Sequence, residues 1–145
     1  MDTSGGGTTQ PQITLSVPGT IEAEQFAAMS GILIEASTDS GGGTGGGKNI
    51  GYVDTGDWLE YSIDVETTGS YLVEYRLASD LGSNDFTTLV DGVEINRQTV
   101  PNTGGWQNWI TQSATMNLQA GPQILRINAL GPSWNMNWIR LSITD

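Results

Sequence analysis

The sequence predicts an all-β fold, and three observations support this prediction. Apolar and polar residues alternate in many segments, whereas no window of about a dozen residues has the apolar period of a helix. Eight or more such short segments, separated by turn-forming residues, indicate a β-sandwich or a barrel. Twenty of the 145 residues are Gly, about twice the usual share, and charged residues make up 14%, against a usual ~25%. This composition suits a domain built from short strands and many turns.

The expected strands follow from this alternation. In chain order they lie at residues 13–17, 20–25, 31–36, 58–65, 71–77, 87–90, 93–95, 109–118, 122–129 and 136–143. The dipeptide Asp91-Gly92 separates two of them and predicts a two-residue hairpin, because both residue types accept positive φ. At most one helical turn fits, around residues 24–29.

The chain length predicts a single domain. We expect residues 13–145 to form it, and residues 1–12, rich in Gly, Thr and Ser, to be a linker-like or tag-like tail. Such a linker suggests a module of a longer protein. No secretory signal is visible in the opening residues, and no run of about 18 apolar residues predicts a membrane span. The acidic composition and the low Lys content favour a secreted, extracellular parent protein.

Charge and missing residue types exclude several function classes. Sixteen acidic and five basic residues give a net charge of -11, which argues against nucleic acid and against an anionic membrane as partners. The chain has no His and no Cys, so catalytic His triads, Cys nucleophiles, zinc sites of the Cys/His type, haem and iron–sulfur ligation are excluded. Any bound metal is expected to be an oxygen-ligated ion such as Ca²⁺ or Mg²⁺.

Three patterns resemble enzyme motifs without their context. Residues 42–48 match a phosphate-binding loop, but Asn49 replaces the required Ser or Thr and no helix pattern follows; the overlapping dinucleotide pattern at 41–46 has no βαβ unit behind it. The triplet beginning at Asp54 resembles that of aspartic proteases, which need a second Asp to share a proton, and an ordinary turn is the simpler interpretation.

A glycosidase is the remaining enzyme alternative, because such enzymes need two carboxylates about 5–9.5 Å apart. Glu60, Asp64 and Glu66 lie on the outward face of one predicted strand, where solvated carboxylates are expected. We therefore predict that the domain is not an enzyme.

The Trp residues point to a different function. Trp58, Trp109 and Trp138 fall in predicted strands, where packing explains them. Trp106 and Trp134 lie beside Gly- or Pro-rich loops and close to Asn residues. An indole face can stack on a sugar ring while amide and carboxylate groups bond its hydroxyls. The alternative is a Trp that simply covers the end of the sandwich.

Several ordered segments resemble the family 6 carbohydrate-binding modules from residue 21 to residue 145. They are IEAEQF at 21–26, IE at 34–35, NIGYVDTGDWLEY at 49–61, GSY at 69–71, TGGWQ at 103–107, LQAG at 118–121 and NMNWI at 135–139. The resemblance implies a jelly-roll β-sandwich of two antiparallel sheets, without catalytic activity and usually appended to polysaccharide hydrolases.

The resemblance also implies the roles of individual residues. In this family a cleft at the loop end holds a sugar between two aromatic rings, which match Tyr52 and Trp106. The hydroxyl-bonding residues match Asn135 and Glu35, and Trp134 is a candidate further wall on position alone.

A structural Ca²⁺ is a further implication of the resemblance, with ligands that match Glu22, Glu24 and Asp145. Glu22 and Glu24 would share one face of a strand, and three carboxylates with backbone carbonyls can supply the six to eight oxygens that Ca²⁺ takes. A solvated strand edge is the alternative.

The ligand is predicted less sharply. Residues 45–61 and 135–139 are most similar to modules of agar hydrolases, which implies binding of agarose or a related neutral galactan, with capture of a chain end. Xylan and β-glucans are the alternative ligands. Two other hypotheses are a small glycosidase and a Ca²⁺-dependent domain that binds a protein partner. If the cleft is not the site, an outer sheet face carrying Glu60, Glu74 and Arg76 is the next candidate.

Overall fold

The computed structural model describes residues 8–9, 13–39, 47–82 and 84–144, and within these residues it contains strands and turns but no helix. One sheet, called sheet 1, has seven strands: β1 (Thr8–Thr9), β2 (Thr14–Val17), β4 (Ala28–Ser30), β7 (Trp58–Val65), β9 (Asn84–Val90), β10 (Val93–Val100) and β12 (Gly121–Ala129). Sheet 2 has six: β3 (Gly19–Glu22), β5 (Leu33–Ala36), β6 (Lys48–Gly51), β8 (Gly69–Ser79), β11 (Gly105–Leu118) and β13 (Asn135–Ile143).

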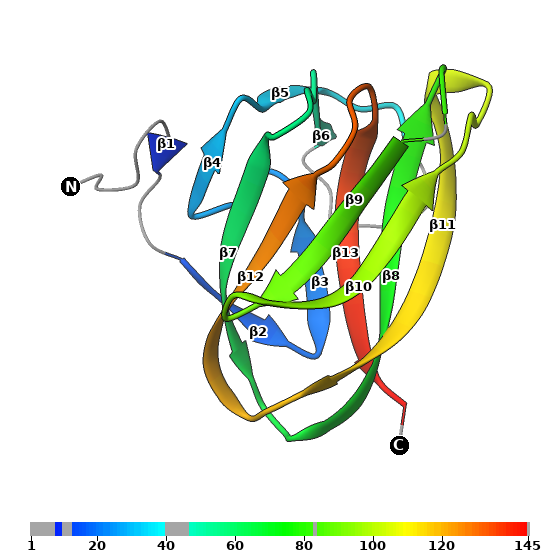
Figure 1. The fold of residues 1–145 in the computed structure, drawn as a ribbon. Helices are drawn as coiled ribbons and strands as arrows, with labels where there is room; N and C mark the ends of the chain where they lie inside the picture. The colour runs from blue at the N-terminus through cyan, green and yellow to red at the C-terminus, as the bar shows by residue number, and fades with distance from the viewer. Residues whose placement is uncertain (1–7, 10–12, 40–46, 83, 145) are drawn as a thin grey trace.

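The two sheets pack as a sandwich, with β7, β12, β9 and β10 in one layer and β3, β13 and β8 in the other (Figure 1). The spatial order is β1-β4-β7-β12-β9-β10 in sheet 1, with β2 beside β7, and β11-β8-β13-β6-β5 in sheet 2, with β3 beside β13. The predicted jelly-roll β-sandwich is therefore confirmed. One pairing departs from the expected antiparallel sheets, because β2 runs parallel to β7.

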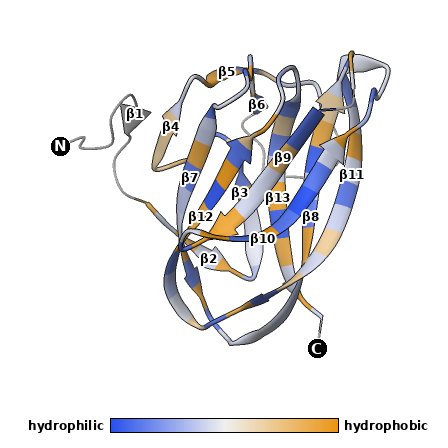
Figure 2. Ribbon diagram, in the orientation of Figure 1, coloured by the Kyte–Doolittle hydropathy of each residue, from blue (hydrophilic) through white to orange (hydrophobic). Residues whose placement is uncertain are grey.

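The alternation of the sequence corresponds to the two faces of each strand. Figure 2 shows apolar and polar bands alternating along β7 and β12. Strand β7 has the predicted bounds, and Asp91 and Gly92 form the predicted hairpin turn with φ values of 49° and 84°. Strand β6 was not predicted. The helical turn expected around residues 24–29 is absent from the structure. The chain makes a non-helical turn there, in which the Gln25 N–H donates to the Glu22 carbonyl at 2.9 Å.

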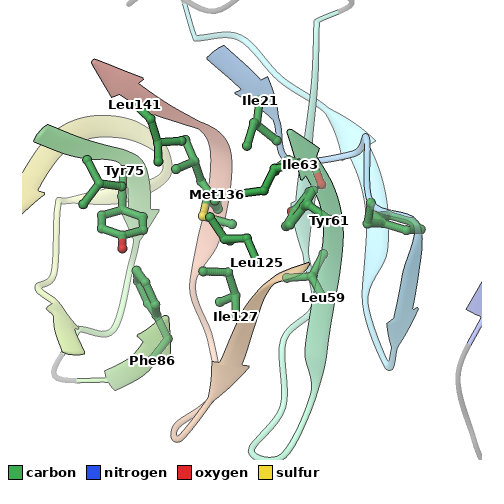
Figure 3. Close-up of a cluster of buried hydrophobic side chains, with 14 of the residues drawn as sticks. Ile21, Leu59, Tyr61, Ile63, Tyr75, Phe86, Leu125, Ile127, Met136 and Leu141 are labelled. Carbon is green, nitrogen blue, oxygen red and sulfur yellow. The ribbon is translucent and has the colours of Figure 1, made fainter. Parts of the chain in front are cut away.

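The core lies between the layers and draws side chains from both. In Figure 3, Leu59, Ile127 and Phe86 of sheet 1 face Met136 and Tyr75 of sheet 2. Buried hydroxyls in this core are hydrogen-bonded, as the physical cost of burying them requires. The Tyr61 hydroxyl donates to the Ala23 carbonyl at 2.7 Å, and the Tyr75 hydroxyl lies 2.6 Å from that of Thr88.

Two further findings bear on the sequence predictions. Residues Thr8 and Thr9, within the predicted tail, form β1 and pair with Ala28 and Met29 of β4. In the part of the chain that the structure describes, no helix has the length and apolar character needed to cross a membrane.

The outer face proposed as a second candidate site does not exist as one surface. Glu60 lies on β7 of sheet 1, whereas Glu74 and Arg76 lie on β8 of sheet 2. Because the outward sides of the two sheets are opposite faces of the sandwich, these residues cannot form a common site. Glu60 is instead paired with Arg126, at 2.7 Å between Oε2 and Nη1.

Candidate carbohydrate-binding cleft

A cleft of about 530 Å³ is lined by residues of β5, of the segment after β6, and of the beginnings of β11 and β13. These segments lie at one end of the sandwich (Figure 1). The size of the cleft is in the usual range of ligand sites, about 300–1,000 Å³. The residues that line it come from four separate parts of the chain: Glu35, Tyr52, Val53, Asp54, Trp106, Gln107, Ser133, Trp134 and Asn135. All five predicted sugar-binding residues are therefore brought together.

Two aromatic rings stand at the rim of this cleft. Tyr52 is 66% exposed and Trp106 is 41% exposed, far more than the other aromatic residues of the core. Tyr52 follows β6 with a φ of 58°, a conformation that costs free energy in a residue other than Gly and recurs at functional sites. An exposed ring is suited to stacking on a flat apolar ligand surface.

The polar base of the cleft is centred on the Glu35 carboxylate. Its Oε2 accepts hydrogen bonds from the Nδ2 atoms of Asn49 at 3.1 Å and Asn135 at 3.3 Å, and from Gln107 Nε2 at 3.3 Å. Asn135 Nδ2 also donates to the Trp106 carbonyl at 2.7 Å. Among the residues that the structure describes, the hydrogen bonds to this carboxylate all go to Oε2 and none goes to Oε1.

Gln107 and Asn49 are part of this arrangement and were not predicted as site residues. Gln107 Nε2 also donates to Asn49 Oδ1 at 3.1 Å, and Asn49 is completely buried. A buried amide needs a hydrogen-bonded environment, which here is provided by the Glu35 carboxylate. The usable signal in the sequence was position, because Gln107 directly follows Trp106 and Asn49 lies three residues before Tyr52.

Gly51 permits the close approach of the Asn135 and Glu35 side chains. A Cβ atom at this position would lie 2.5 Å from Asn135 Oδ1 and 3.2 Å from Glu35 Oε1. The first distance is too short for any side chain, so only Gly leaves room for this placement of Asn135. The Gly-Tyr pair in the sequence therefore provides space at one position and a ring at the next.

Trp134 lies at the buried bottom of the cleft and does not form one of its exposed walls. It is 1% exposed, its ring packs 5.0 Å from that of Phe86, and its Nε1 donates to the Gly131 carbonyl at 3.0 Å. A ring buried on both sides offers no free face for stacking. The interpretation that this Trp covers the end of the sandwich is the one that fits.

The charge of the cleft suits a neutral ligand. Of the described residues that line it, two carry carboxylates, Glu35 and Asp54, and none is Lys or Arg. Asp54 belongs to the predicted turn, where its N–H donates to Asp57 Oδ2 at 2.8 Å and its carbonyl accepts from the Asp57 N–H at 3.1 Å. The segment that resembles an aspartic-protease motif, beginning at Asp54, is therefore an ordinary turn.

The predicted metal ligands lie apart from the cleft, and one lies outside the described residues. Glu22 ends β3, opposite Trp138, and is 6% exposed, whereas Glu24 follows in the turn; the expectation that both share a strand face is wrong. Burial raises the pKa of the Glu24 carboxyl above its usual value, and the neighbouring Glu22 charge adds to the rise. Asp145 is outside the described residues, within which no group of three acidic side chains is placed to hold a metal.

Comparison with known proteins gives a consistent family. The model of the carbohydrate binding module (family 6) matches residues 22–143. Among solved structures, module CBM6cm-2 of Cellvibrio mixtus lichenase 5A, in complex with cellotriose, is 42% identical, with a TM-score of 0.79 over 89% of this chain and 99% of that chain. A β-1,3-glucan binding module from Bacillus halodurans is 32% identical, with a TM-score of 0.77 over 89% of this chain and 98% of that chain.

One of the curated relatives is an agarase. The β-agarase AgaA of Microbulbifer thermotolerans is 31% identical over 101 residues, which cover 65% of this chain and 23% of that protein. The chain spans less than a quarter of the length of the curated relatives it matches. The family match over nearly all of the strands, and the structural matches over almost the full length of isolated modules, lead to one conclusion: the chain belongs to the family 6 carbohydrate-binding modules.

Proposed function

We propose that this non-catalytic module binds a neutral polysaccharide in the cleft and thereby holds a secreted hydrolase on its substrate. The observation that carries the proposal is the placement of two exposed rings, Tyr52 and Trp106, over the same cavity as Glu35 and Asn135. Rings of this kind stack on the apolar face of a sugar, and the carboxylate and amide groups bond its hydroxyls. The absence of basic side chains among the described lining residues agrees with an uncharged ligand.

Two polysaccharide backbones are supported by different observations. A β-linked glucan is favoured by the solved modules, which are the more similar proteins and are described with cellotriose or as β-1,3-glucan binding. Agarose is favoured by the similarity to the β-agarase, and it is the ligand that the sequence segments predict. Because the identity to the cellotriose-bound module is higher and its coverage is greater, we place the β-glucan first and agarose second.

Affinity electrophoresis tests this proposal directly. The domain should be retarded in native gels that contain barley β-glucan, laminarin, agarose or xylan, compared with a gel without glycan and with a protein that binds no sugar. Retardation by one glycan identifies its backbone. Free migration in every gel would refute the proposed function, and the domain would then be tested for protein partners and for glycan hydrolysis.

We expect the cleft to capture the end of a chain. Asn135 and Trp134 are at most 4% exposed although they line the cavity, so the cleft has a floor, whereas Tyr52 and Trp106 form an exposed rim. A terminal sugar can reach the bottom of a closed cleft and contact it. An internal sugar is held away from the bottom by its two neighbouring sugars and therefore makes fewer contacts.

Calorimetry with oligosaccharides of the retarding glycan measures this preference. Blocking the non-reducing end, or separately the reducing end, should reduce the affinity about tenfold or more for the end that enters the cleft. Equal affinities for the free and both blocked forms would show that the module binds along the chain.

We also propose a structural Ca²⁺ at Glu22 and Glu24, with Asp145 as third carboxylate. The pair fits a hard cation, because two carboxylates lie close together at the end of β3 and one of them is almost fully buried. A bound cation would compensate for the repulsion between the two charges and would link the first strand of sheet 2 to the end of the chain.

Removal of calcium should lower the melting temperature without abolishing the fold. A ligand at a hundred times its Kd stabilises by about 2.7 kcal/mol, which corresponds to roughly 5–10 °C for a domain of this size. Melting curves in EDTA, in EDTA saturated with Ca²⁺, and for Glu22→Gln check this expectation. The variant should not respond to EDTA, and an unchanged wild-type melting curve would remove the calcium site.

A further inference from the structure

An unusually buried ion pair lies on the outer side of sheet 2, away from the cleft. Arg76 binds Asp39 through two contacts, at 2.9 Å between Nη2 and Oδ1 and at 3.0 Å between Nε and Oδ2. The Asp39 side chain is 2% exposed and that of Arg76 is 18% exposed, whereas the Arg97–Asp85 pair is exposed by 57% and 22%. Two-point pairing fixes the relative orientation of the partners, and burial makes separation costly.

Further hydrogen bonds tie both members of this ion pair to the sheet. Asn137 Nδ2 donates to Asp39 Oδ2 at 2.8 Å, and Arg76 Nη1 donates to the Thr111 hydroxyl at 2.9 Å. These partners lie on β13, β8 and β11. Residue 39, three residues after the end of β5, is therefore anchored directly to β8 and β13 and, through Arg76, to β11.

The residue before Asp39 connects this anchor to the cleft. The Thr38 N–H donates to Gln107 Oε1 at 2.8 Å, and its hydroxyl donates to the same oxygen at 3.3 Å. Trp109 Nε1 donates to the same oxygen at 3.2 Å. With its oxygen held by Thr38 and Trp109, Gln107 presents Nε2 to Glu35 Oε2 at 3.3 Å. A series of neighbouring residues thus connects the buried ion pair, through Thr38 and Gln107, with the Glu35 carboxylate of the cleft.

We infer that Asp39 and Arg76 are positioning residues of the sugar site: their ion pair fixes Thr38, and through it the amide that orients Glu35. The inference rests on the proposed function of the cleft. Neither Asp39 nor Arg76 lines the cavity, so the pair does not contact a sugar in the cleft directly, and the contacts through Thr38 and Gln107 provide a route by which it can affect binding. The exposed Arg97–Asp85 pair has no such connection among the described hydrogen bonds of its side chains.

A double-mutant cycle on binding tests the inference. Calorimetry with cellotriose and with neoagarotetraose is done on the wild type, Asp39→Asn, Gln107→Ala and the double variant, with Asp85→Asn as the matched control. Each of the first two changes should lower the affinity about tenfold, and the double variant should lose little more than the weaker-binding single variant, because both changes interrupt one path. Asp85→Asn should bind like the wild type. A merely structural role of Asp39 would leave the two effects independent.

The outcomes separate this inference from the proposed function. Wild-type affinity in Asp39→Asn, or losses that multiply to about a hundredfold in the double variant, would overturn the positioning role while leaving the cleft as the sugar site. Absence of binding by the wild type to either oligosaccharide and to the glycan gels would refute the function, and the inference with it. If Asp39→Asn melts below the assay temperature, Arg76→Lys replaces it in the cycle, because it keeps the charge but not the two-point contact, and the same non-additivity is expected.

Discussion

Trp106→Ala should lose nearly all sugar binding while the domain stays folded. The ring is 41% exposed, so its removal takes little from the core. Its polar contact to the site is made by the backbone, whose carbonyl accepts from Asn135 Nδ2 at 2.7 Å and is kept in the variant. Truncation of a central aromatic anchor typically costs about 2 kcal/mol or more in binding, roughly thirtyfold in affinity. Calorimetry and a melting curve measure the two quantities separately.

Two control variants sharpen this prediction. Trp106→Phe keeps a flat ring and should retain most of the affinity. Val93→Ala removes another exposed apolar side chain, 64% exposed in β10 beside the hairpin turn, and should bind like the wild type. Normal binding by Trp106→Ala would mean that the cleft is not the sugar site.

Gly51→Ala should also weaken sugar binding strongly, by displacing the Asn135 side chain. The added methyl group would meet Asn135 Oδ1 at 2.5 Å, so the amide has to turn away. Asn135 would then lose its hydrogen bonds to Glu35 and to the Trp106 carbonyl. Because the group that yields is the end of a side chain, the fold should lose only about 1–3 kcal/mol, whereas affinity should fall about tenfold or more.

Gly69→Ala is the matched control for this substitution. Gly69 begins β8, has no neighbour within 4 Å of the added Cβ, and has no positive φ, so alanine should be accepted there. The affinities and melting temperatures of both variants are compared with those of the wild type. Unchanged affinity in Gly51→Ala would show that the placement of Asn135 is not required for binding.

The strands with clear alternation were predictable from the sequence, and the least regular ones were not. Strand β7 shows its buried face at every second residue, and the Asp91-Gly92 turn identified the β9–β10 hairpin. Strand β6 carries Lys48, Asn49 and Gly51 and has almost no apolar alternation, because Lys48 is exposed and Asn49, although polar, is buried by its hydrogen bond to the Glu35 carboxylate. A binding site built into a strand removes the pattern by which strands are recognised.

The residues of the candidate site also fall into those that could be predicted from the sequence and those that could not. The resemblance identified Glu35, Tyr52, Trp106 and Asn135, and the structure brings all four to one cleft. The burial of Trp134 was not predictable from local sequence, because its ring packs against Phe86, 48 residues earlier in the chain. Contacts between distant segments, rather than local patterns, decide which aromatic ring remains free.

The placement of Asn135 also bears on how the molecule folds. Its hydrogen bond to Glu35 joins positions 100 residues apart, and it begins β13, which lies in the middle of sheet 2. Sheet 2 therefore cannot close until nearly the whole chain is available, and such long-range β topologies fold slowly, in roughly milliseconds to seconds. Sugar-binding competence should thus appear only at the last stage of folding, and retention on a glycan matrix would select fully folded molecules from truncated or misfolded ones.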